Sequence, residues 1–176
     1  WDEASRVKSQ YHTVYALLGV AAATVANRPG AHELLETMLQ EQKDYWIDDY
    51  GLVWDQYDEA FSEPAPVHAL GTLIHTIEAY MAAAEATTEP EWLDRAEKMT
   101  AFAYKVASKN NWRIPEYYDE EWQPSLEAGK LCNDGRRYHE GYVTGHSMQL
   151  ARFTLQVRAG LRSMGWDVPD YLLEMG

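Results

Sequence analysis

Two histidines, each followed three residues later by a polar partner, have the residue types and spacing best suited to chemistry. His75 precedes Glu78, and His146 precedes Gln149. On a helix, residues three apart lie on the same face. A carboxylate can fix the tautomer of an imidazole and favour its charged form, whereas a glutamine can orient the ring but cannot act as a base. Two such helices facing each other would form an acid–base pocket.

The sequence contains no other catalytic signature of comparable strength. It has no His-x-x-x-His pair, a single cysteine (Cys132), no phosphate-binding glycine loop, no dinucleotide-binding glycine pattern and no Gly-x-Ser-x-Gly elbow. We therefore expect no metal and no organic cofactor. His32 and His68 are more typical of structural histidines, and His12 has a somewhat better claim because it follows Tyr11.

An acidic run offers an alternative chemistry. Glu116, Asp119, Glu120 and Glu121 could supply the paired carboxylates of a glycosidase. The 7 tryptophans and 12 tyrosines would suit stacking against a sugar ring. Acidic loop runs are usually only solvated, and core packing explains most aromatic residues, so both signals are weak.

Helices must position these groups, and the hydrophobic spacing predicts five of them. The first spans residues 5–27, with Tyr11, Val14, Tyr15, Leu18 and Ala22 on one stripe. The others span residues 31–47, 67–87, 91–109 with a proline at an early position, and 144–164 with Thr144 as N-cap. A sixth helix has barely begun after the cap at Asp170. Short connections make the first four helices two antiparallel hairpins.

Two long connections separate these helices. Residues 48–66 read as a polar, aromatic loop, and residues 110–141 as a long irregular segment with a short extended piece at residues 112–116. Loops of such length in compact domains are usually functional. Hairpins repeated two and a half times predict an all-α fold of the α/α toroid or solenoid type. The chain starts at Trp1 and stops one turn into a helix, so we expect it to be a piece of a longer protein.

Composition restricts the class of protein and its partners. Hydrophobic residues make up 46% and charged residues 24% of the 176 residues, as in ordinary globular domains. The net charge of −13 argues against binding to nucleic acid or to an anionic membrane. One cysteine excludes an internal disulfide and suits a reducing compartment, and no apolar run is long enough to span a bilayer. We expect a cytoplasmic protein.

Several motifs together resemble the N-acylglucosamine 2-epimerase superfamily, which includes mannose isomerases, cellobiose 2-epimerases and sulfoquinovose isomerases. Gly71-Thr-Leu-Ile-His75-Thr-Ile-Glu78-Ala79 stands where that family has Asn-x-Asn-Met-His-x-x-Glu-Ala. The segment from Trp112 to Pro124 is similar to its Pro-Glu-His-x-Asp-x-x-Trp-x-Pro loop and is the most specific match. Further matches are Lys8–Tyr11, Glu91–Ala96, Arg136–Tyr138 and Gly145–Gln149.

The resemblance implies a single domain over residues 1–176, forming the central part of an (α/α)6 barrel that is cut at both ends. It also implies metal-independent isomerisation or 2-epimerisation of a free monosaccharide through a cis-enediol, with the mannose–fructose type favoured. His146 would be a general acid/base, with His75 and Glu78 binding hydroxyls and helping to open the ring. The implied sugar contacts are Tyr11, Glu116, Trp122, Arg136, Arg137 and Gln149.

Three departures from the family pattern keep other interpretations open. Gly71 and Leu73 replace asparagines that hold sugar hydroxyls, and Gln149 replaces a glutamate. A catalytically impaired, sugar-binding or structural member of the same fold is therefore the first alternative, and an α/α-barrel glycosidase is the second. A partial toroid would expose the apolar flanks of its end hairpins, so we expect it to form a homo-oligomer or to need further helices.

Overall fold

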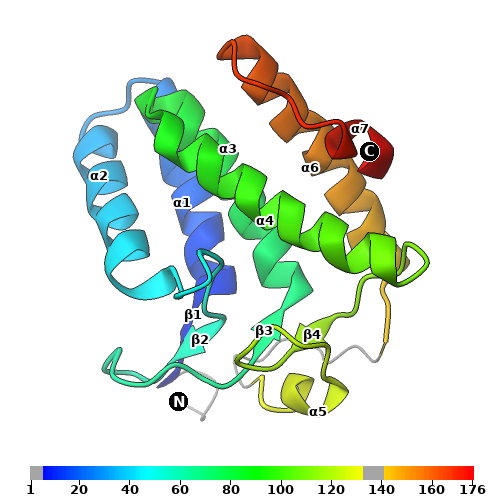
Figure 1. Ribbon diagram of the computed structural model, residues 1–176. Helices are drawn as coiled ribbons and strands as arrows, with labels where there is room; N and C mark the ends of the chain where they lie inside the picture. Colours follow the sequence, from blue (N-terminus) through cyan, green and yellow to red (C-terminus); the bar gives the residue numbers. More distant parts are fainter. Residues whose placement is uncertain (1–5, 133–140) are drawn as a thin grey trace.

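The structure is a computed structural model that describes residues 6–132 and 141–176. Three long helices, α1 (Gln10–Val25), α3 (Leu70–Thr87) and α6 (Thr144–Ser163), begin at the same end of the molecule (Figure 1). This end also carries the short strands and the loops (Figure 1). Residues in the first turns of these three helices are therefore brought near one another.

The remaining helices pack around this set. The helix α2 (Ala31–Glu41) lies against α1, and α4 (Pro90–Lys109) lies against α3 and α6 (Figure 1). The short helix α7 (Tyr171–Met175) packs on α6 and α4, and α5 (Leu126–Gly129) lies among the loops. The long helices α1 and α3 are thus each followed along the chain by a helix that packs against them, which is the arrangement of two hairpins predicted from the sequence.

One hydrophobic core joins these helices, and α4 shows how the pattern specifies it. The predicted stripe of α4 faces inward, with Trp92, Leu93, Ala96 and Met99 buried and Phe102 packed against the core. Proline stands at the start of α4, where its missing N–H costs nothing. The core also takes in Leu17 from α1, Leu35 from α2, Ile77 from α3 and Val157 from α6.

The predicted stripe of α1 is wrong in its direction. The buried residues of this helix are Gln10, Val14, Leu17 and Ala21, whereas the Tyr15 side chain remains 43% exposed. Small apolar residues occur on several faces of α1, so spacing alone did not identify the face that packs. Tyr11 and Tyr15 consequently lie on a face that the core leaves open.

Two small antiparallel ladders fix where α1 and α3 begin. Strand β1 (Lys8–Ser9) pairs with β2 (Gln56–Tyr57), and α1 begins only after β1, at Gln10. The helix predicted from residue 5 therefore starts later than expected. Strand β3 (His68–Ala69) pairs with β4 (Tyr117–Tyr118), and α3 starts at Leu70 instead of Val67. The sequence predicts a short extended piece at residues 112–116, whereas the strand in the structure is β4, which begins directly after this range. Backbone pairing with distant segments outcompetes helix formation at these positions.

The ends of two other helices also differ from the prediction. The helix α6 is preceded by Val143 as N-cap, with Thr144 as its first helical residue, because the Val143 N–H is held by the Glu116 carboxylate. The helix predicted for residues 31–47 changes into a π-helical turn at Gln42–Trp46. This turn buries Gln42 and Trp46, and the Gln42 amide hydrogen-bonds Gln10 and Tyr80 inside the core.

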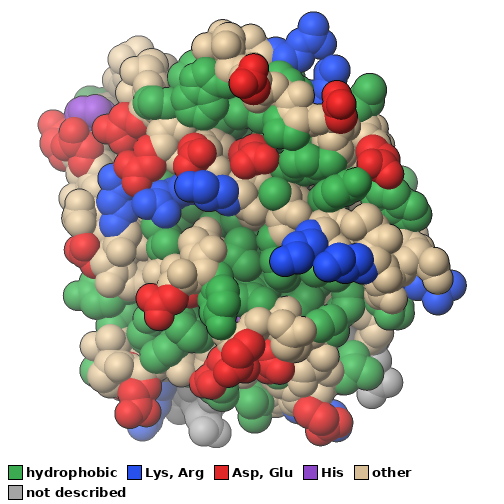
Figure 2. Space-filling model, viewed as in Figure 1, with side chains coloured by type: hydrophobic (Ala, Val, Ile, Leu, Met, Phe, Trp, Pro, Cys, Tyr) green, Lys and Arg blue, Asp and Glu red, His purple; other side chains and the backbone are tan. Residues whose placement is uncertain are grey.

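The outer surface shows no large basic field on the face formed by α2 and α4. Acidic and basic side chains are interspersed with apolar ones across the described part of this face (Figure 2). Within the residues that the structure describes, no helix has the length and apolar character needed to cross a bilayer.

Candidate active site

Glu116 and His146 form the most tightly held pair of titratable side chains near the starts of α3 and α6. The distance from His146 Nδ1 to Glu116 Oε2 is 2.6 Å, and the Glu116 side chain is 3% exposed. The other carboxylate oxygen, Oε1, accepts a hydrogen bond from the Val143 N–H at 3.0 Å. Because an ionised carboxylate only accepts, Nδ1 of His146 carries the hydrogen and the ring's lone pair lies on Nε2 when the ring is neutral.

The backbone of Glu116 holds the same two helix starts together. Its carbonyl accepts from the Leu70 N–H, at the first residue of α3, and its N–H donates to the carbonyl of Gly141. The buried carboxylate is therefore fixed from both sides, which fixes the orientation of the His146 ring. A positioned imidazole of this kind is the usual general acid/base of enzymes working near neutral pH.

His75 anchors a second group of polar side chains one turn into α3. Its Nδ1 lies 3.2 Å from Glu78 Oε2, and its Nε2 lies 3.0 Å from the Tyr15 hydroxyl. The Tyr15 and Tyr11 hydroxyls are 3.4 Å apart. Partial burial, the hydrogen bond with Tyr11 and the charge of Glu78 raise the pKa of Tyr15, so its hydroxyl keeps its proton in neutral solution.

Gly71 lies where the two groups meet. A Cβ atom on Gly71 would be 3.5 Å from His146 Cε1, 3.8 Å from His146 Nε2 and 4.0 Å from a ring carbon of Tyr11. The Tyr11 ring in turn lies edge-on to His75, with ring centroids 5.6 Å apart. His75 follows Gly71 by four residues on α3, which is about 6 Å along a helix axis. The two imidazoles therefore converge on one region, bordered by Tyr11.

The remaining residues predicted to contact sugar are not shown beside the two histidines. Gln149 is partly buried on α6, and His146 has Glu116 among its partners. Trp122 is buried in the core, where its ring stacks on His68 and its Nε1–H donates to Asp48 Oδ2. Its contact with sugar stays a prediction. The predicted contacts of Arg136 and Arg137 lie outside the described residues.

The other described histidines have structural or surface positions. His68 is fully buried between Trp54 and Trp122, and its Nδ1 donates to the Val53 carbonyl. Burial lowers the pKa of His68, which keeps the ring neutral. His32 pairs with Glu36 on the surface of α2. His12 is exposed on α1 and touches only the edge of Tyr11 among the ring contacts described.

Gly71 and Leu73, which replace asparagines of the family pattern, have different surroundings. Leu73 is fully buried in the hydrophobic core, so its side chain contributes packing. Gly71, in contrast, adjoins the His146 ring and Tyr11. Of these two positions, only residue 71 can change the space beside the imidazole.

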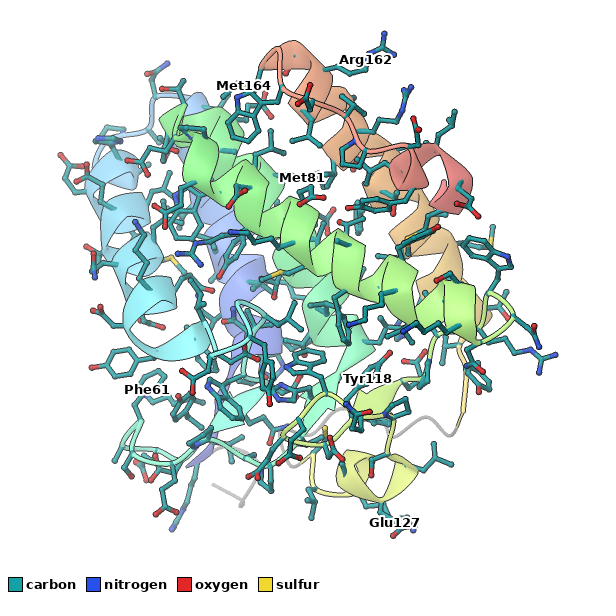
Figure 3. All side chains as sticks on the ribbon, viewed as in Figure 1. Phe61, Met81, Tyr118, Glu127, Arg162 and Met164 are labelled. Atoms are coloured by element: carbon teal, nitrogen blue, oxygen red, sulfur yellow. The ribbon has the colours of Figure 1, made fainter. Side chains whose placement is uncertain are left out.

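A groove of about 590 Å³ runs from Glu78 along the space between α3 and α6. Met81 and Glu85 on α3 and Arg152 and Met164 on α6 are among the residues that line it. Figure 3 places Met164 at the end of α6 that is remote from Tyr118 and the loops. The groove therefore extends away from the end at which the histidines lie. Glu78 both lines this groove and pairs with His75.

Sequence reasoning missed two features of this site. The hydrophobic spacing predicts a packing role for Tyr15, although its spacing of four from Tyr11 places both hydroxyls on one face. Glu116 was expected to bind sugar, whereas its two carboxylate oxygens are taken by His146 and Val143. Among residues 6–132 and 141–176, no group of three or more His, Cys, Asp or Glu side chains is placed to hold a metal ion.

The helices thus bring two carboxylate-paired imidazoles to one end of the described structure. A model of the N-acylglucosamine 2-epimerase (GlcNAc 2-epimerase) family matches residues 2–169, and the chain belongs to this family of sugar isomerases and 2-epimerases. The family resemblance stated from the sequence is thereby confirmed.

Similar proteins include D-mannose isomerases. The D-mannose isomerase of Thermobifida fusca is 33% identical over 171 residues, covering 94% of this chain and 40% of the relative. That of Pseudomonas cannabina pv. alisalensis is 30% identical over 176 residues, covering 98% of this chain and 42% of the relative. The chain thus spans only about two fifths of the length of these relatives.

Solved structures establish the fold. A crystal structure of D-mannose isomerase superposes with a TM-score of 0.80 at 21% identity, covering 96% of this chain and 42% of that one. The cellobiose 2-epimerase of Spirochaeta thermophila superposes with a TM-score of 0.76 at 20% identity, covering 97% of this chain and 42% of that one. The chain forms part of an (α/α)6 barrel, as the sequence predicted.

Proposed function

We propose that the protein acts in a sugar isomerase or 2-epimerase that moves a proton between adjacent carbons of a free, open-chain monosaccharide, with mannose–fructose interconversion favoured. The observation that supports this most directly is the convergence of His146 and His75 on the space beside Gly71 and Tyr11. The 33% identity with a D-mannose isomerase supports the choice of sugar.

In this proposal His146 is the base that acts on carbon. Glu116 occupies Nδ1, so proton exchange with the sugar would use Nε2, the nitrogen beside Gly71. Nε2 takes the proton from C2 of the open-chain aldose, and the C–H electron pair forms the C1–C2 double bond of a cis-enediol. The carbonyl electrons pass to O1, which gains a proton. Delivery of this proton to C1, with loss of the O2 proton as the C2 carbonyl forms, gives the ketose. Delivery of a proton to C2 from the opposite face by a second group, with loss of the O1 proton as the C1 carbonyl re-forms, gives the epimer.

The two carboxylates make this chemistry feasible near neutral pH. Glu116 compensates the positive charge that develops on His146 when its ring takes a proton. Glu78 does the same for His75, which lies on the side where the sugar oxygens would gain and lose protons. Because protons supplied by imidazoles neutralise the enediol oxygens, the proposed reaction is metal-independent.

The test is deuterium incorporation by the protein at its natural full length. Incubation with D-mannose in D₂O, followed by NMR, should give fructose labelled at C1. His146→Ala should reduce exchange by at least about 100-fold, because general acid–base groups typically contribute that much. His32→Ala is the matched control, since His32 is on the surface of α2 and pairs only with Glu36 among the described ion pairs. Retained turnover in His146→Ala would refute the role of this residue.

The same experiment separates the two alternatives. A sugar-binding protein without catalysis would bind mannose but exchange no deuterium with any free hexose, and Gly71 and Gln149 are the departures that favour it. A glycosidase would release a reducing end from a glycoside. Its proposed carboxylates are poorly placed, since Glu116 is committed to His146 and Asp119 accepts from the backbone N–H groups of Glu121 and Gln123.

A further inference from the structure

The two ring nitrogens of His75 both have protein partners, which restricts how this residue can reach a sugar. Nδ1 faces the Glu78 carboxylate at 3.2 Å, and Nε2 faces the Tyr15 hydroxyl at 3.0 Å. A carboxylate accepts only, so Nδ1 carries a hydrogen in both protonation states of the ring. The proton that can be exchanged is therefore the one shared between Nε2 and the Tyr15 oxygen.

The reaction itself requires a second proton transfer besides the one on carbon. Conversion of an aldose into a ketose moves one hydrogen from C2 to C1 and another from O2 to O1. His146 would serve the carbon proton. An oxygen shuttle needs a group that can both donate and accept at the same atom, and a tyrosine hydroxyl backed by an imidazole has this property.

Resting on the proposed function, we propose that Tyr15 is a catalytic residue whose hydroxyl, backed by His75 and Glu78, carries the proton between the two sugar oxygens. Tyr15 lies one helical turn from Tyr11 on the open face of α1, and the residue is 43% exposed, so the core does not enclose it. Glu78 completes the chain as the counter-charge for the His75 imidazolium.

The steps balance when the ring of His75 starts as an imidazolium. As His146 removes the C2 proton, O1 takes the Tyr15 hydroxyl proton, and the Tyr15 oxygen takes the Nε2 proton of His75. The enediol then collapses: the O2–H pair becomes the C2 carbonyl, its proton passes to the Tyr15 oxygen, and the Tyr15 proton returns to Nε2. His146 delivers its proton to C1. Both histidines and Tyr15 end in their starting states.

The raised pKa of Tyr15 fits this use. Because its pKa is raised, the Tyr15 hydroxyl keeps its proton in neutral solution. It would therefore accept a proton from one side as it donates one to the other, without accumulating as a phenolate. Tyr11 lies 3.4 Å from the Tyr15 oxygen and would help to orient its hydroxyl. His75 is thereby assigned to act through Tyr15, while Tyr15 makes the direct contact with the sugar.

The first test is Tyr15→Phe in the full-length protein, with Tyr45→Phe as the matched control. Tyr45 is 42% exposed and packs through its ring on Phe61, a contact that phenylalanine preserves. Tyr15→Phe should lower kcat by at least about 100-fold with KM changed less than about threefold. Tyr45→Phe should leave both constants at wild-type values.

A second test distinguishes proton transfer from a structural role. Incorporation of 3-fluorotyrosine at position 15 makes the phenol more acidic without removing the hydroxyl, and it should shift the pH profile of kcat, whereas 3-fluorotyrosine at position 45 should not. The ¹⁵N signal of His75 Nε2 should move in both position-15 variants. A wild-type protein that exchanges no deuterium overturns the proposed function and this role with it. An active wild type with equally active Tyr15→Phe overturns the relay alone.

Discussion

Replacing Glu116 with glutamine tests whether the buried carboxylate sets the tautomer of His146. The glutamine oxygen can still accept from the Val143 N–H, as Glu116 Oε1 does at 3.0 Å. Its NH₂ group then faces Nδ1 of His146, where a carboxylate oxygen now lies at 2.6 Å. Because an amide NH₂ only donates, Nδ1 must become the acceptor, and the ring hydrogen moves to Nε2. The lone pair then points away from the sugar.

The expected losses follow from this geometry. Glu116 is 3% exposed and makes a charge-assisted hydrogen bond, so its removal should cost about 1.5–3 kcal/mol of folding free energy. The wrong tautomer should reduce deuterium exchange by about 10²–10⁴-fold, the range over which an orienting carboxylate acts on a catalytic histidine. The fold should persist, because the amide has nearly the same shape as the carboxylate.

The assay combines three measurements on the full-length protein: unfolding in urea, deuterium exchange at the sugar carbons, and ¹⁵N NMR of the His146 ring. Glu121→Gln is the matched control, since Glu121 belongs to the same loop but its side chain is exposed. Exchange within about threefold of wild type, together with an unchanged His146 tautomer, would refute the argument that Glu116 sets the base.

Two further predictions concern the packing around the site. Gly71→Ala should stabilise α3 by up to about 1 kcal/mol, and Gly19→Ala should stabilise α1 by a similar amount. Only Gly71→Ala should lower activity, because its Cβ would lie 3.8 Å from His146 Nε2. Nothing lies within 4 Å of a Cβ at Gly19. Thermal unfolding and exchange rates check this, and equal activity of the two variants would contradict it. Burial lowers the pKa of His68 below its ordinary value of 6.5, so the unfolded chain binds more protons below that pH. Stability should therefore fall by up to about 1.4 kcal/mol per pH unit as the pH drops through 6.5, and urea titrations of His68→Phe should show a weaker dependence than wild type.

The periodic elements of this protein could be predicted because their information is local. Helix α4 was predicted to within one residue at its start, and its inward stripe was correct, since large apolar residues alternate clearly with charged ones. The position of helix α1 in the chain was predicted, but the face that packs was not, because its own alanine, valine and leucine residues occur on several of its faces. The motif with His75 and Glu78 was also identified, since both partners lie on one helix three residues apart.

The sequence by itself determined the hairpins, the family and the two histidines, because helical period, turn residues and short motifs depend on neighbours in the chain. Only the tertiary structure decided which groups hold those histidines. Glu116 is 30 positions from His146, and Tyr15 is 60 positions from His75. Such pairings arise because α1, α3 and α6 begin at one end, where the strand pairs and the Glu116 backbone bring their first turns together. No local pattern encodes a contact made by folding distant segments onto one another.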